Sequence, residues 1–175
     1  MSEDICNGLR TQSGRNIECI NKSEGGEEII RANGSHVLGY IDNQIALAIK
    51  SPEGEIRANV GFFIHAKERG HIKEICNAGY NDPLIFLQGI LDNWTEIKEG
   101  NNNSFWLIRP LQDKHNGVIV LKNTQNENLE NIYKISTLMY VRERNIRNKK
   151  TLYTGHPATV NSSGSAVNLT AVHSI

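Results

Sequence analysis

Four strand-like segments follow one another in the second half of this chain, separated by short polar turns. Each is rich in β-branched and aromatic residues, and the period of its apolar positions falls to about two. Parallel strands would need long crossover connections, usually helices, and the gaps here are too short for them. The sequence therefore predicts a four-stranded antiparallel meander formed by Trp94–Lys98, Ser104–Leu111, Val118–Lys122 and Ile132–Val141.

Two helices are indicated before the meander. Apolar residues at Ile72, Ile75 and Cys76 follow helical spacing and predict a helix over Ala66–Ala78. A second helix is expected over Pro83–Leu91, because an aspartate at position 82 can cap the first amides and proline at the first helical position loses no hydrogen bond. Together the two helices would form a helical hairpin.

Further strands are indicated on either side of these elements. Val37–Ile41 and Gln44–Lys50 are apolar runs separated by Asp42-Asn43, a pair that tolerates tight turn geometry, so we expect a β-hairpin. Ile56–Ile64 would continue as a third strand. Thr151–Thr154 would add an edge strand after the meander.

These elements define an α+β fold, with an N-terminal β-hairpin region, a helical hairpin and a four-stranded antiparallel sheet. The chain has 175 residues, which lies within the range of a single domain. We expect residues 1–60 to pack as a loop and hairpin region on a core formed by residues 61–154. Residues 155–175 would form a C-terminal tail.

The charge of the chain is balanced overall but uneven along its length. Lys and Arg number 19 and Asp and Glu number 19, so the net charge is zero and the whole-protein field favours no polyanionic partner. A basic block near residue 145 is either a solvated face or a contact for an anionic partner. Its members are Arg142, Arg144, Arg147, Lys149 and Lys150.

The sequence offers no pattern typical of a metal site or a membrane span. Three cysteines without CxxC spacing and six dispersed histidines disfavour zinc, and the odd cysteine count disfavours a disulfide framework. No apolar run approaches the roughly 18 residues of a membrane helix. We therefore expect no metal, no other cofactor and no membrane partner.

The start of the helical hairpin gathers groups that can move protons and groups that stay cationic: His65, Lys67, Arg69, His71 and Lys73. Metal-free cleavage of RNA needs a base for the ribose 2′-hydroxyl, an acid for the leaving 5′-oxygen and fixed cations around the phosphate. The pattern favours this chemistry, with His71 as acid or base. The alternative for His71 is an exposed or capping role near a helix start.

The last strand of the meander supplies further candidates. Strict alternation would place five of its residues on one face, namely Lys134, Ser136, Leu138, Tyr140 and Arg142. Thr137 would then lie on the more apolar face, where its hydroxyl either bonds locally or points into a cleft. We take Thr137 as a catalytic candidate and Ser136, Lys134, Arg142 and Arg109 as candidates for substrate binding, with His115 as a further cationic candidate.

Two stretches carry a resemblance to a known family. Gly70-His71-Ile72 and the residues from Ile90 through Ile97 to Gly100 resemble elements that are common in the barnase/EndoU/colicin/RelE superfamily of metal-independent ribonucleases. The order of elements over Gly61–Tyr153 is similar to the nuclease modules of phage-borne proteins and contact-dependent inhibition toxins.

The resemblance implies an endoribonuclease toxin domain that cleaves RNA, with tRNA as one candidate target, and leaves a 2′,3′-cyclic phosphate. The family's helix-borne histidine corresponds to His71, and its late-strand hydroxyl corresponds to Thr137 or Ser136. The resemblance also implies action in the cytoplasm, delivery as the C-terminal part of a larger exported protein, and a cognate immunity protein as partner.

Two other classes stay open on the sequence alone. A non-catalytic binding module, such as an immunity or phage accessory protein, would fit the zero net charge and the lack of a strict motif. An ADP-ribosyltransferase is the second, because Arg109, Ser136-Thr137 and Glu143 superficially follow the Arg, Ser-Thr, Glu order of that class.

Overall fold

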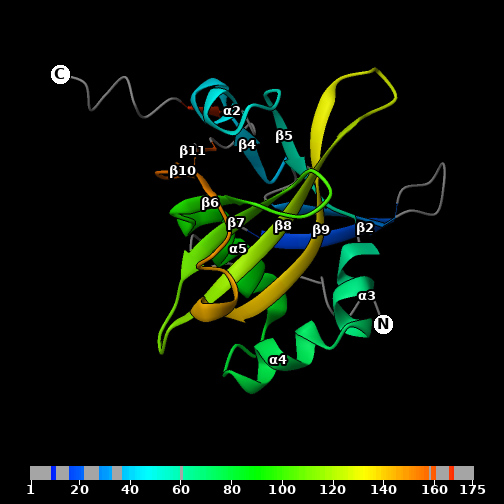
Figure 1. Cartoon of the computed structure of the whole chain (residues 1–175). Helices are drawn as coiled ribbons and strands as arrows, with labels where there is room; N and C mark the ends of the chain where they lie inside the picture. Colours follow the sequence, from blue (N-terminus) through cyan, green and yellow to red (C-terminus); the bar gives the residue numbers. More distant parts are fainter. Residues whose placement is uncertain are drawn as a thin grey trace.

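In the computed structural model, one mixed seven-stranded sheet curls into a half-barrel and shares a core with the helices (Figure 1). The structure describes residues 37–59 and 61–157 in full. It also describes the backbone of five short strands, β1 (Leu9–Arg10), β2 (Asn16–Asn21), β3 (Glu28–Ala32), β11 (Thr159–Val160) and β12 (Ala166–Val167). β2 pairs with β1 and with β3, and β11 pairs with β12.

The large sheet has the order β10-β6-β7-β8-β9-β5-β4. Its strands are β4 (Gly39–Ile41), β5 (Gly54–Arg57), β6 (Glu96–Glu99), β7 (Ser104–Pro110), β8 (His115–Gln125), β9 (Asn131–Arg142) and β10 (Thr151–Thr154). The helices are α2 (Asn43–Ile49), α3 (Gly61–Glu68), α4 (His71–Asn77) and α5 (Pro83–Asn93), and a short 3-10 helix, η1, spans Glu143–Asn145.

The predicted four-stranded antiparallel sheet is wrong, although its meander is present. β6, β7, β8 and β9 pair antiparallel in chain order, and β10 adds an edge strand next to β6, as expected. The sheet continues beyond β9, because β5 pairs with β9 in parallel and β4 pairs with β5. The parallel pairing joins Glu55 to Ile132, and such distant partners leave no local signal in the sequence.

The predicted N-terminal hairpin is also wrong, because Gln44–Lys50 belongs to a helix. The side chain of Asp42 accepts a hydrogen bond from the Ile45 amide at 3.0 Å and so caps α2. The helix ends at Ile49, and the next residue, Lys50, adopts a left-handed conformation with φ of 54°. Likewise, the expected strand Ile56–Ile64 is divided between β5 and α3.

The helix predicted over Ala66–Ala78 is broken, whereas the next one is confirmed. Gly70 has φ of 81°, a conformation that glycine adopts without steric cost, and it separates α3 from α4. Asp82 caps α5 as expected, accepting hydrogen bonds from the amides of Leu84 and Ile85 at 3.1 and 3.3 Å.

Most buried residues lie in one core between the sheet and the helices. α5 approaches the sheet closely at Gly117 of β8, where a Cβ would lie 2.9 Å from the side chain of Ile90. The opposite face, called the outer face below, carries a smaller cluster of Ile108, Val118, Val120 and Ile146. Among the described residues, no helix is long and apolar enough to cross a membrane.

A bulge in β9 changes which side chains share a face. The register shifts between Val120 and Leu121 of β8, which pair with Thr137 and Ile135, so Ser136 is the extra residue. Beyond the bulge, Leu138 and Tyr140 face the helices, whereas Thr137, Met139 and Val141 face outward. The predicted common face for Lys134 and Tyr140 is therefore wrong, since strict alternation does not hold across a bulge.

Candidate functional site

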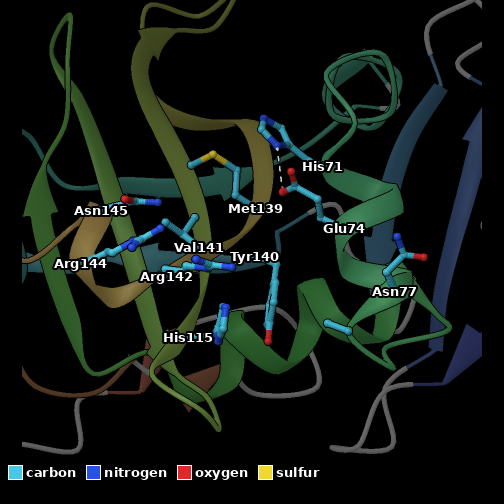
Figure 2. A pocket seen from close by; sticks show the side chains of 11 residues that line it. His71, Glu74, Asn77, His115, Met139, Tyr140, Val141, Arg142, Arg144 and Asn145 are labelled. Atoms are coloured by element: carbon cyan, nitrogen blue, oxygen red, sulfur yellow. Dashed lines mark ion pairs between the residues drawn. The ribbon is translucent and has the colours of Figure 1, made fainter.

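A pocket of about 680 Å³ lies beside the second half of β9 (Figure 2). β5 pairs only with residues 132–134 of β9. Beyond these residues, the edge of β9 that faces away from β8 borders α3 and α4 instead of another strand. The pocket extends from α4 across the end of β9 to η1. Its lining includes His71, Glu74, His115, Tyr140, Arg142 and Arg144.

His71 is the first residue of α4 and forms one wall of the pocket. Its side chain is 25% exposed, and its Nδ1 lies 3.9 Å from Oε2 of Glu74. This Nδ1 is buried and lacks a hydrogen-bond partner, and the carboxylate of Glu74 lies just beyond hydrogen-bond distance from it.

The surroundings of His71 favour its neutral form. Burial lowers the pKa of His71 below its ordinary value, and the nearby positive charges of His65 and Arg69 lower this pKa further, while Glu74 partly opposes both effects. At neutral pH the imidazole is therefore mostly uncharged and able to accept a proton.

The second imidazole of the pocket, that of His115, stacks on the ring of Tyr140. The two ring centroids are 4.5 Å apart and the planes differ by 4°. The contact follows from the strand register, because His115 lies opposite Arg142 and the residue opposite Tyr140 is Gly117, which has no side chain to separate the rings.

A backbone carbonyl fixes the tautomer of His115. Its Nδ1 lies 2.7 Å from the carbonyl oxygen of Asp113, which can only accept, so Nδ1 carries the hydrogen. The Nε2 atom then remains for proton exchange with a ligand. Burial, and secondarily Tyr80 and Asp113, raise the pKa of Tyr140, so its phenol stays protonated at neutral pH.

Two exposed arginines complete the pocket, Arg142 at the end of β9 and Arg144 in η1. Figure 2 shows them on the side opposite the residues from α4, with Met139 and Val141 between the two groups and with His115 and Tyr140 lower in the view. A proton acceptor, a second imidazole and two permanent cations therefore border one open space. This set of groups suits an anionic substrate that undergoes proton transfer.

Some of the residues chosen from the sequence surround this pocket. His71 and Arg142 line it, and so does His115. His65 and Arg69 do not line it, but their charges act on His71.

Other chosen residues lie elsewhere. Lys134 is eight residues from Arg142 along β9, about 26 Å at the rise of a strand, so the two cannot hold the same small group. Arg109 of β7 lies against Gly89 of α5. Lys67 is exposed on α3 and does not line the pocket.

The two hydroxyl candidates do not line the pocket either. Thr137 is buried and its Oγ1 has no hydrogen-bond partner, and its outward neighbours Met139 and Val141 do line the pocket. Ser136 occupies the bulge. Arg109 and Thr137 lie on opposite faces of the sheet, which disfavours the ADP-ribosyltransferase arrangement.

Sequence reasoning missed Glu74, Asn77 and Arg144 as parts of the site. Arg144 belongs to the basic block, but its position at the pocket depends on the turn after β9. Tyr140 was placed on a face with Arg142, yet its stacking on His115 follows from the register of β8 and β9, which the sequence does not specify.

No group of three or more His, Cys, Asp or Glu side chains in the described part of the chain could hold a metal ion. Cys76 is free, while Cys6 and His173 lie outside the described residues and only the backbone of Cys19 is described. Compared with models of protein families, with curated proteins and with solved structures, the chain matches none of them.

Proposed function

We propose that this protein is a metal-independent endoribonuclease whose active site is the pocket between α4, β9 and η1. The observation that carries the proposal is the position of His71, held neutral at neutral pH, across the pocket from Arg142 and Arg144, with His115 in the lining of the same pocket. The predicted four-stranded fold is absent, so the proposal depends on this pocket and not on a family architecture.

The proposed reaction is an in-line transfer of the phosphoryl group. Neutral His71 accepts the proton of a ribose 2′-hydroxyl, whose oxygen forms a bond to phosphorus. The bond from phosphorus to the 5′-oxygen breaks, and Nε2 of protonated His115 donates a proton to that oxygen. Arg142 and Arg144 stabilise the charge that develops on the phosphoryl oxygens. The products are a 2′,3′-cyclic phosphate and a 5′-hydroxyl.

The proposal extends to the biological setting implied by the sequence. A domain that cleaves cellular RNA, tRNA among the candidates, would act as a toxin and would require an inhibitory partner in the producing cell. Expression of the chain would then stop growth. A non-catalytic binding module would leave growth unchanged and would bind its partner without product formation.

Incubation of the purified protein with RNA in excess EDTA tests the reaction. Because no step uses a metal, we expect cleavage to continue, and mass spectrometry should detect fragments that end in a 2′,3′-cyclic phosphate. A matched RNA with one 2′-deoxynucleotide at the cleaved position should resist, since it lacks the attacking hydroxyl. Loss of cleavage in EDTA, or fragments with a 5′-phosphate, would exclude this mechanism.

The pH dependence of kcat/KM should follow the protonation of His71. Activity is expected to fall at acidic pH with a midpoint below the ordinary pKa of histidine, because only the neutral ring accepts the proton. Glu74→Gln removes a carboxylate that raises the pKa of His71, so the acid limb should move to lower pH. Arg69→Gln removes a charge that lowers this pKa and should move the limb to higher pH.

Opposite shifts in these two variants would identify His71 as the titrating base. The two substitutions change exposed side chains by a single charge, so each serves as the control for the other. Shifts in the same direction, or an acid limb that neither variant moves, would assign the titration to another group.

A further inference from the structure

The segment after β9 crosses the outer face of the sheet from β9 to β6. Ile146 anchors it in the outer cluster with Ile108, Val118 and Val120. At its far end, the carbonyl of Lys149 accepts a hydrogen bond from Nζ of Lys98 at 3.1 Å. The next carbonyl, of Lys150, accepts one from the amide of Glu99 in β6 at 2.9 Å. The segment is therefore held in place along its length.

This segment is strongly basic, although the whole chain has no net charge. Between residues 142 and 150 there are five Arg or Lys residues and one glutamate, which gives 5 − 1 = +4. We call Arg142–Lys150 the basic strip. Arg147 and Lys150 are exposed, and Nζ of Lys149 lies 4.4 Å from the centroid of the Trp106 ring.

The basic strip begins inside the pocket, because Arg142 and Arg144 belong to both. From β9 to β6 it covers three spacings between strands, about 14 Å, and one strand of a duplex carries one phosphate per about 3.4 Å of its axis, so the segment is long enough to lie beside several phosphates. A polyanion whose reacting group occupies the pocket would thus meet further cations next to it.

We infer that the basic strip binds backbone phosphates of RNA that flank the phosphate in the pocket. This inference rests on the proposed RNA cleavage and specifies its substrate: an RNA strand with several phosphates and not an isolated nucleotide. The strip contacts phosphates through charge, so it adds affinity without selecting a base sequence.

Binding of a fluorescein-labelled 12-nucleotide RNA, measured by anisotropy over a series of KCl concentrations, tests the inference. All proteins carry His71→Ala to prevent turnover. Arg147→Gln/Lys150→Gln should weaken binding and reduce the slope of log affinity against log salt by about 1.4, since each lost phosphate contact is worth about 0.7 for a single strand.

The matched control is Lys50→Gln/Lys134→Gln, which removes the same charge from two exposed residues at the other end of β9. Lys134 is near the start of β9, and Lys50 precedes Ser51, whose hydroxyl lies 2.6 Å from that of Tyr133 on the same strand. This control should leave the slope unchanged.

Equal slopes in the two double variants, no binding of RNA by the parent protein, or binding to phosphatidylserine vesicles in place of RNA would overturn the inference. Its failure is distinguishable from failure of the proposed function. If the strip variant lowers the salt slope but the protein with His71 intact never cleaves RNA, the proposed function is refuted and the inference stands. If the protein cleaves RNA but the strip variant leaves the salt slope unchanged, the inference is refuted and the function stands.

Discussion

Replacing His71 with alanine is expected to lower the rate of RNA cleavage by about 10³-fold, the typical contribution of one general base. The imidazole of His71 lies on the side of the pocket formed by α4, and its surroundings favour the neutral form that can accept a proton. Single-turnover cleavage of a defined RNA in EDTA measures the effect. Circular dichroism checks that the variant keeps its secondary structure.

Lys73→Ala is the matched control for this prediction. Lys73 lies on the exposed side of the same helix and does not line the pocket, so its removal should change the rate by less than about threefold. A His71→Ala variant that cleaves RNA as fast as the Lys73→Ala variant would refute the assignment of His71 as the base.

Leu84→Ala is expected to lower the free energy of unfolding by about 2–5 kcal/mol. Leu84 is the second residue of α5, is fully buried and belongs to the main core, so truncation leaves a cavity. The matched control is Leu47→Ala on α2, where the side chain is 72% exposed and the effect should stay within about 0.5 kcal/mol. Urea denaturation compares the two, and similar values for both would contradict the position of α5 in the core.

The elements with strong local signals were predictable from the sequence. Asp82 followed by Pro83 fixes the start of α5, and the alternating segments separated by polar turns correspond to β6, β7, β8 and β9. The segment Gln44–Lys50 was mistaken for a strand, because a short apolar run fits both periods and an aspartate before it suits a turn as well as a helix cap.

Tertiary features explain the remaining errors. The parallel pairing of β5 with β9 connects residues far apart in the chain, and the bulge at Ser136 depends on the partner strand. The same bulge determines which residues of β9 line the pocket, because it turns Tyr140 toward the helices and Thr137 away from them. His71 was chosen as a candidate from its chemistry and from the family resemblance, but its neighbours in the pocket come from α4, β8, β9 and η1, whose convergence requires the fold.

The parallel contact between β5 and β9 also bears on the order in which the protein assembles. β7, β8 and β9 are joined by short connections and can pair early, whereas the pairing of β5 with β9 must close a long loop that contains α3, α4, α5 and most of the meander. Until β5 arrives, the first residues of β9 present unpaired amides and carbonyls. While it lasts, this open strand edge favours pairing with another copy of the chain.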